Sequence, residues 1–159
     1  MAPPPRRGFG KILTAPLLVF ALLSTIVFLG IAAWETNNAI SILNSSNIIT
    51  SLRSVINSFD GNGATPLLVI LALIAGVAAV TSHFVGLHHV RVWTTPSASA
   101  AQAAAWIAFG LLTLPFALVW KEIHLGGHIG VKTQVMGAFV IIGTVVHFAY
   151  TLILYVPDR

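Results

Sequence analysis

Cysteine is absent from the 159-residue sequence, and charged side chains are scarce. The lack of cysteine excludes disulfide bonds, thiolate metal sites and cysteine nucleophiles. Only 8% of the residues are charged and 57% are hydrophobic, whereas about 25% of the residues in a typical soluble domain are charged. Because twelve charged side chains cannot cover the surface of a soluble domain of this size, the composition disfavours a soluble enzyme, a nucleic-acid binder and a disordered chain. It indicates a membrane protein.

The hydrophobic residues are concentrated in uncharged stretches, each of about twenty residues, which is enough to cross a bilayer as a helix. Soluble amphipathic helices would show polar residues at every third or fourth position, and these stretches do not. We therefore expect an all-α membrane protein, a four-helix transmembrane bundle. The chain is expected to form a single domain, residues 1–159, whose basic amino terminus, residues 1–11, is disordered. The expected spans are Ala15–Trp34, Pro66–Val85, Ala101–Trp120 and Val135–Val156.

Proline and threonine residues mark the expected helix ends. Pro16 and Pro66 are expected in first turns, where a missing N–H costs nothing. Thr65 is expected to cap the second helix. Pro115 lies inside the third span and predicts a kink there.

The distribution of positive charge predicts the orientation of the chain. With a cytoplasmic amino terminus, the cytoplasmic side holds five cations and the opposite side three, which favours both termini inside. The first loop is then extracellular, and its Asn44 sequon is accessible to glycosylation. The basic residues before the first apolar run also resemble a secretory signal, but this run is longer than a signal core, so we interpret it as a retained helix.

The first loop, Glu35–Ala64, is the longest connection. Apolar residues recur in it at helical spacing, which predicts one short amphipathic helix lying at the membrane interface. The alternative is an ordinary ordered loop that covers the bundle. The apolar residues in question are Ile48, Leu52, Val55, Ile56 and Phe59.

His147 lies near the middle of the fourth span, with Thr144 and Thr151 on the same helical face and Tyr150 beside it. An ionisable residue inside a membrane is a functional-site hypothesis by default. The alternative is a neutral imidazole that hydrogen-bonds to another helix and joins the spans. No charged residue lies in the spans to pair with His147 in a proton relay.

The loops hold the remaining histidines. In the third loop, Lys121, His124 and His128 have three interpretations. The first is a solvated glycine-rich turn in which Lys121 and Glu122 anchor the third helix at the interface. The others are a zinc site with Glu122 and a mouth that attracts a carboxylate ligand. The spacing gives no complete metal-ligand set, so we expect no metal. The second loop holds His83, His88 and His89. This loop is expected on the cytoplasmic side, so these histidines cannot join those of the third loop.

Signatures of catalysis are missing from the sequence. It has no phosphate-binding loop, hydrolase elbow or metalloprotease motif, and its four acidic residues are dispersed. We therefore expect no enzyme activity and no cofactor. Small residues along the spans permit close helix packing or a homodimer face, and membrane lipid is the expected partner.

Three strings, in order, resemble the plant AWPM-19-like plasma-membrane family. They are Gly61–Thr65 (GNGAT), His89–Trp93 (HVRVW) and Lys121–His128 (KEIHLGGH), and the start of the first span, Ala15–Val19, is also similar. The resemblance implies a plasma-membrane protein linked to abscisic acid and to dehydration or cold responses, with a proposed role in the entry of abscisic acid into cells.

Two functions follow as hypotheses. The first is a facilitator of uptake of a small weak acid such as abscisic acid, acting as a homodimer or larger assembly because four helices leave little room for an internal path. Its ligand-binding residues would be Lys121, His124 and His128 at the outer mouth and Thr144, His147 and Tyr150 along the path. The second is a structural or stress-protective tetraspan that organises membrane lipid or partner proteins.

Overall fold

The described chain contains four long apolar helices. The computed structural model describes residues 9–45, 59, 63–126 and 130–155. Each helix is long and apolar enough to cross a membrane, and even the shortest, with 23 residues, is about 35 Å long at 1.5 Å per residue. The prediction of an all-helical multi-pass membrane protein is thus confirmed. The helices are α1 (Phe9–Ser45), α3 (Thr65–Val92), α4 (Thr95–Leu125) and α5 (Val131–Ile153).

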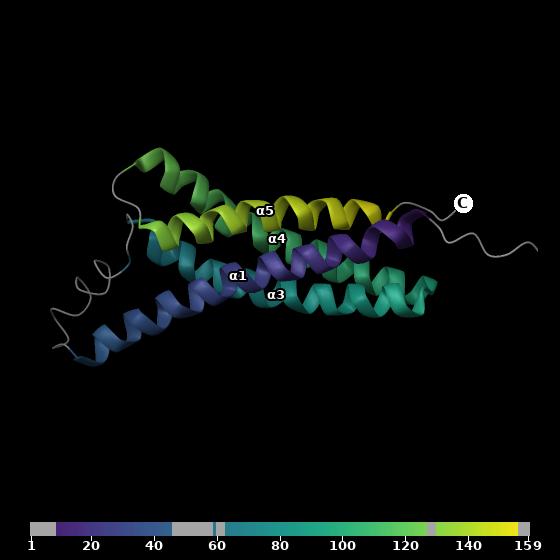
Figure 1. Ribbon diagram of the computed structural model, residues 1–159, viewed down its shortest axis with the longest axis horizontal. Coiled ribbons are helices and arrows are strands. Elements are labelled where there is room, and N and C mark those ends of the chain that lie inside the picture. The colour runs from purple at the N-terminus through teal and green to yellow at the C-terminus, as the bar shows by residue number, and fades with distance from the viewer. Residues whose placement is uncertain (1–8, 46–58, 60–62, 127–129, 156–159) are drawn as a thin grey trace, which may run out of the picture.

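The helices run alternately in opposite directions, so that α1 begins and α5 ends at the same end of the bundle (Figure 1). We call this end, which also holds the α3–α4 turn, the terminal end, and the other the far end. Helices α3 and α5 each pack against both α1 and α4. The four helices therefore form a ring in which α3 and α5 face each other across the centre.

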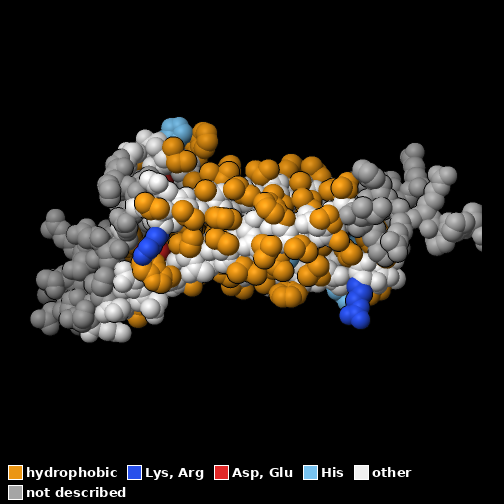
Figure 2. Space-filling model, in the orientation of Figure 1, with side chains coloured by type: hydrophobic (Ala, Val, Ile, Leu, Met, Phe, Trp, Pro, Cys, Tyr) orange, Lys and Arg blue, Asp and Glu red, His pale blue; other side chains and the backbone are white. Residues whose placement is uncertain are grey.

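Small residues allow the helices to approach closely. A methyl group added at Gly76 of α3 would lie 2.8 Å from Leu29 Cδ1 and 3.1 Å from Phe28 Cε2 of α1. Hydrophobic side chains cover the middle of the outer surface, and the charged side chains in view lie toward the two ends (Figure 2). This is the pattern expected of a bundle in lipid. The alanine and glycine residues buried in α3 and α4 are Ala72, Ala75, Gly76, Ala79, Gly86, Ala101, Ala105 and Ala108.

The start of α3 differs from the prediction. Pro66 lies in its first turn, as expected, but the N-cap is Ala64 and no side chain caps this helix. Thr65 is not the cap because its hydroxyl donates to Oε1 of Glu122 in α4. A contact between helices has replaced the local one. The end of α3, by contrast, is closed by Trp93 in the left-handed conformation (φ 50°), whose N–H donates to the His89 carbonyl.

Helix α1 is longer than its predicted span. It begins at Phe9, so residues 9–11, which we expected to be disordered, are helical, and Pro16 lies inside the helix and not in its first turn. Glu35, assigned to the first loop, is also part of α1. The helix thus extends beyond both ends of the apolar run, and it begins about two turns before Pro16.

Three other predictions concern the first loop, Asn44 and Pro115. The predicted amphipathic helix of the first loop lies outside the described residues, apart from Phe59, which is buried against the core. Asn44 is exposed in the last turn of α1. Helix α4 continues through Pro115 as one element.

Candidate functional site

Three of the fully buried polar side chains lie together between α3 and α5, and we call them the central polar cluster: His83 of α3 with His147 and Tyr150 of α5. Each is 0% exposed. His83 Nε2 lies 3.1 Å from His147 Nδ1, and the Tyr150 ring lies 5.7 Å from the His147 ring and 6.4 Å from the His83 ring, centre to centre. The cluster therefore joins the two helices that face each other across the ring.

Hydrogen-bond partners fix the arrangement of protons in this pair when both rings are neutral. His147 Nε2 lies 3.0 Å from the carbonyl oxygen of Ala105 in α4, and a carbonyl only accepts, so this nitrogen donates. His147 Nδ1 then accepts from His83 Nε2–H. This assignment leaves His83 Nδ1 as a bare acceptor, and it links α3, α5 and α4 through one chain of hydrogen bonds.

Two atoms of the cluster have no hydrogen-bond partner among the described residues. They are His83 Nδ1 and the hydroxyl oxygen of Tyr150, and both are buried. The hydroxyl of Ser82, the residue before His83, is also buried without a hydrogen-bond partner among the described residues. A buried polar group without a partner costs about 1–3 kcal/mol, and such groups are rare in folded proteins. The cluster therefore holds a bare acceptor and a free donor in the interior, which is an unusual arrangement for a folded protein.

Glycine makes room for the tyrosine. A methyl group added at Gly86 of α3 would collide with the Tyr150 hydroxyl and would lie 3.0 Å from both Tyr150 Cζ and Leu18 Cδ2. The phenol therefore lies directly against the backbone of α3. Any larger residue at position 86 would have to displace it.

The other residues of the predicted site lie in different places. Thr144 is on the same helix as the cluster and is buried, but its hydroxyl donates to the Val140 carbonyl of its own helix. Lys121 and His124 are exposed at the far end, where His124 Nδ1 lies 2.9 Å from the Trp120 carbonyl oxygen. His128 lies outside the described residues. The structure thus brings together His147 and Tyr150 and separates them from the third-loop residues.

His83 does not lie in a loop, and its predicted position was wrong. We assigned it to a cytoplasmic loop, but α3 continues to Val92 and His83 is buried inside the bundle. The same extension places His88, His89 and Arg91 on the last turns of α3. His89 stacks on Trp93 with ring centres 4.7 Å apart, and its Nδ1 lies 2.8 Å from Ser97 Oγ of α4. It therefore fastens the α3–α4 turn.

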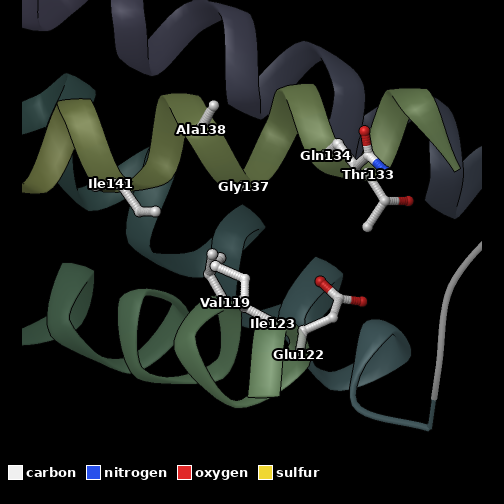
Figure 3. A pocket seen from close by; sticks show the side chains of 8 residues that line it. All are labelled: Val119, Glu122, Ile123, Thr133, Gln134, Gly137, Ala138 and Ile141. Atoms are coloured by element: carbon white, nitrogen blue, oxygen red, sulfur yellow. The ribbon is translucent and has the colours of Figure 1, made fainter. Parts of the chain in front are cut away.

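Glu122 also lies in an environment that differs from the prediction. We expected it to be a solvated anchor, but it is only 3% exposed and accepts a hydrogen bond from Thr65. This contact joins the end of α4 to the start of α3. Its carboxyl group also lies near the first turn of α5 (Figure 3), where negative charge is favoured by the helix dipole.

A groove between α4 and α5 begins at this carboxyl group. It has a volume of about 220 Å³, and its polar residues gather at the far-end side while the rest of the lining is apolar (Figure 3). Hereafter it is the α4–α5 groove. Its lining comprises Val119, Glu122, Ile123, Thr133, Gln134, Gly137, Ala138 and Ile141.

A cation lies on the other side of α5. Lys132 Nζ is 3.5 Å from the centre of the Trp34 ring, a cation–π contact between α5 and α1 at the far end. Tryptophan and lysine favour the headgroup level of a membrane, so this pair indicates where the far end meets the interface. Within the described residues, no group of three or more His, Cys, Asp or Glu is placed to hold a metal ion.

The sequence of this chain is similar to those of known proteins. The AWPM-19-like family matches residues 17–157. A rice protein (Oryza sativa subsp. japonica) called Membrane protein PM19L is 40% identical over 149 residues, which cover 94% of this chain and 78% of the rice chain. No solved structure shows significant similarity.

Proposed function

The chain belongs to the AWPM-19-like family, and we propose that it facilitates the uptake of a small weak acid such as abscisic acid across the plasma membrane during dehydration or cold stress. The observation that supports this proposal most is the central polar cluster, because ionisable side chains in the interior of a membrane bundle mark a functional site by default. Both termini are proposed to be cytoplasmic, which makes the far end extracellular.

The cluster offers the two groups that a protonated carboxylic acid needs. Such an acid has one O–H donor and one carbonyl acceptor. His83 Nδ1 is a bare acceptor in the tautomer given above, and the Tyr150 hydroxyl is a free donor; both are buried and lack partners in the described chain. An acid bound between them would satisfy both atoms, which otherwise cost about 1–3 kcal/mol each.

Access to the cluster requires movement or assembly. Tyr150 packs on Gly86 and Leu18 without space for a methyl group, so the acid must enter as α3 and α5 separate, or along an interface between copies of the chain. A homodimer or larger assembly is therefore part of the proposal. Lys121, His124 and His128 would attract the ionised acid to the outer mouth, and no ATP or coupling ion is involved.

The test is uptake of labelled abscisic acid into liposomes that contain the purified full-length protein. At pH 7.5 almost all of a carboxylic acid is ionised, so unassisted diffusion of its neutral form is slow. Wild-type protein is expected to take up tracer faster than empty liposomes. Tyr150→Phe removes the donor but keeps the packed ring, and it is expected to lower uptake to the level of empty liposomes.

The matched control is Tyr155→Phe. Tyr155 is exposed, and its hydroxyl accepts from Trp106 Nε1 at the terminal end, away from the cluster. This variant should keep the wild-type rate. Uptake by wild-type protein that is no faster than in empty liposomes, or equal uptake by Tyr150→Phe and wild type, would refute the proposal.

A second candidate function is a structural or stress-protective tetraspan that organises membrane lipid or partner proteins. The close packing of Tyr150 on Gly86 favours it, because a rigid interior suits a scaffold better than a path. This candidate expects His147→Gln to be tolerated and the protein to be captured with a specific partner in detergent. A protein always recovered alone would count against it.

A further inference from the structure

A second groove lies between α1 and α5, on the opposite side of α5 from the α4–α5 groove, and we call it the α1–α5 groove. It has a volume of about 320 Å³. Its lining consists of Gly30, Ile31 and Trp34 of α1 together with Lys132 of α5. Trp34 is 47% exposed, and Gly30 and Lys132 are exposed as well. Because both helices are apolar enough to cross a membrane, a groove on their outer surface faces lipid.

The groups in this groove follow the order in which a phospholipid presents its parts. Trp34 and Lys132 lie at the headgroup level, which tryptophan and lysine favour. Gly30 lies one helical turn before Trp34, about 6 Å further into the hydrocarbon. A methyl group added at Gly30 would meet nothing within 4 Å, so this position forms a hollow in the surface of α1. The groove therefore offers a polar site at the interface and an apolar hollow directly beneath it.

The charge at the polar site is positive. The Lys132 ammonium has three N–H donors and no acceptor, and no carboxylate in the described part of the chain forms a salt bridge with it. Glu35, the neighbour of Trp34, is only 2% exposed and does not line the groove. A lipid head with a net negative charge is therefore favoured over a neutral one, by about fivefold for one lysine near a membrane surface.

Trp34 also holds the charge in place. A flexible lysine side chain loses conformational entropy when it is ordered by a ligand. The contact of Lys132 Nζ with the Trp34 ring, 3.5 Å from the ring centre, orders the ammonium before any ligand arrives. We propose that the α1–α5 groove binds an anionic phospholipid, whose phosphate accepts from the Lys132 ammonium and whose acyl chain lies in the hollow at Gly30. This site is independent of the central polar cluster.

The experiment uses full-length protein in phosphatidylcholine liposomes with a small amount of photoactivatable lipid. Two probes carry the same diazirine near the carbonyl end of one acyl chain, and they differ in their heads: phosphatidylglycerol is anionic and phosphatidylcholine has no net charge. Labelled peptides are identified by mass spectrometry. The phosphatidylglycerol probe is expected to label the segment around Gly30 and the start of α5 about fivefold more than the phosphatidylcholine probe does.

Two pairs of matched variants separate this site from general contact with lipid. Lys132→Met removes the charge, so labelling by the phosphatidylglycerol probe should fall to that of the phosphatidylcholine probe. Lys121→Met makes the same change at an exposed lysine of α4 and should leave the labelling of the groove unchanged. Gly30→Leu fills the hollow and should abolish the labelling there. Gly110→Leu changes another glycine with open space around it and should have no effect on the groove.

The competitor is glycerol phosphate, which has the phosphate of the lipid but no acyl chain. In excess it should not displace the phosphatidylglycerol probe, and displacement would show that the charge alone binds, which contradicts the proposal. The proposal is also overturned by equal labelling of the groove with the two probes, by labels spread evenly over the apolar surface, or by labelling like wild type in Lys132→Met or Gly30→Leu. None of these outcomes depends on whether the protein takes up a weak acid.

Discussion

Replacement of Gly86 by alanine tests the packing of the central polar cluster. Gly86 lies in α3 opposite Tyr150 of α5, and an added methyl group would meet the Tyr150 hydroxyl at a distance that real contacts never show. It would also lie 3.0 Å from Leu18 Cδ2. Because Tyr150 is fully buried, its ring has nowhere to move without displacing α3, α5 or the histidine pair.

The expected cost follows from two opposing effects. Overpacking a buried site costs about 1–3 kcal/mol, while replacing glycine by alanine in a helix gains roughly 0.5–1 kcal/mol. We expect Gly86→Ala to lower the free energy of unfolding by about 1–2 kcal/mol. Tyr150→Phe removes the atom that collides most severely, so the double variant should recover about 1 kcal/mol of this loss.

The measurement is the free energy of unfolding in detergent micelles, from a denaturant titration followed by circular dichroism. Gly110→Ala is the control, because nothing lies within 4 Å of a methyl group at Gly110, and this variant should be as stable as wild type or slightly more stable. Tyr150→Phe alone should be neutral or stabilising, because the hydroxyl it removes has no partner in the described chain. Equal stability of Gly86→Ala and wild type, or a loss that Tyr150→Phe does not relieve, would show that Tyr150 does not pack against Gly86.

Three further variants test other contacts. His147→Ala leaves His83 Nε2–H and the Ala105 carbonyl without their partner and opens a cavity, so the free energy of unfolding should fall by about 3 kcal/mol; a loss below about 1 kcal/mol would contradict the hydrogen-bond chain. Thr65→Val removes one donor to the buried Glu122 and should cost about 1–3 kcal/mol in the same titration, whereas unchanged stability would place Glu122 in water. Lys132→Met removes the cation above Trp34; Trp34 emission should shift while stability falls by less than about 1 kcal/mol, and an unchanged emission spectrum would argue against the contact.

The spans were predictable because bilayer thickness sets the length of an apolar run. All four predicted stretches lie largely or wholly within the helices of the structure. The helix ends were harder to predict. Helix α1 continues through Pro16 and Glu35, since a helix ends where tertiary contacts stop supporting it and not where hydropathy falls. The resemblance to the AWPM-19-like family is confirmed by the match over residues 17–157.

The candidate site was predictable only on one helix. Periodicity placed His147 and Tyr150 on one face of α5, and the structure buries both in the bundle centre. The partner, His83, is 64 positions away in the sequence, and no local pattern relates two residues on helices that face each other across a ring. The sequence did indicate that His83 could lie inside the membrane, because it falls within the uncharged apolar stretch Pro66–Val85.

Glu122 and Thr65 illustrate the same limit. Each lies at the end of an apolar run, where a charged or hydroxyl residue is ordinarily solvated or caps its own helix. Their pairing across α3 and α4 depends on how the helix ends meet, which depends in turn on the packing of small residues along the whole bundle. Local sequence contains no measure of that packing.

The hydrogen bond between His83 and His147 is the contact on which the account depends. In lipid bilayers, nitrogen NMR of histidine-labelled protein detects coupling across an N–H···N hydrogen bond between two imidazoles. The account predicts a coupling between His83 Nε2 and His147 Nδ1, with His147 protonated at Nε2 and His83 Nδ1 bare, and loss of that coupling in His83→Gln. Two independently solvated imidazoles without such a coupling would contradict it.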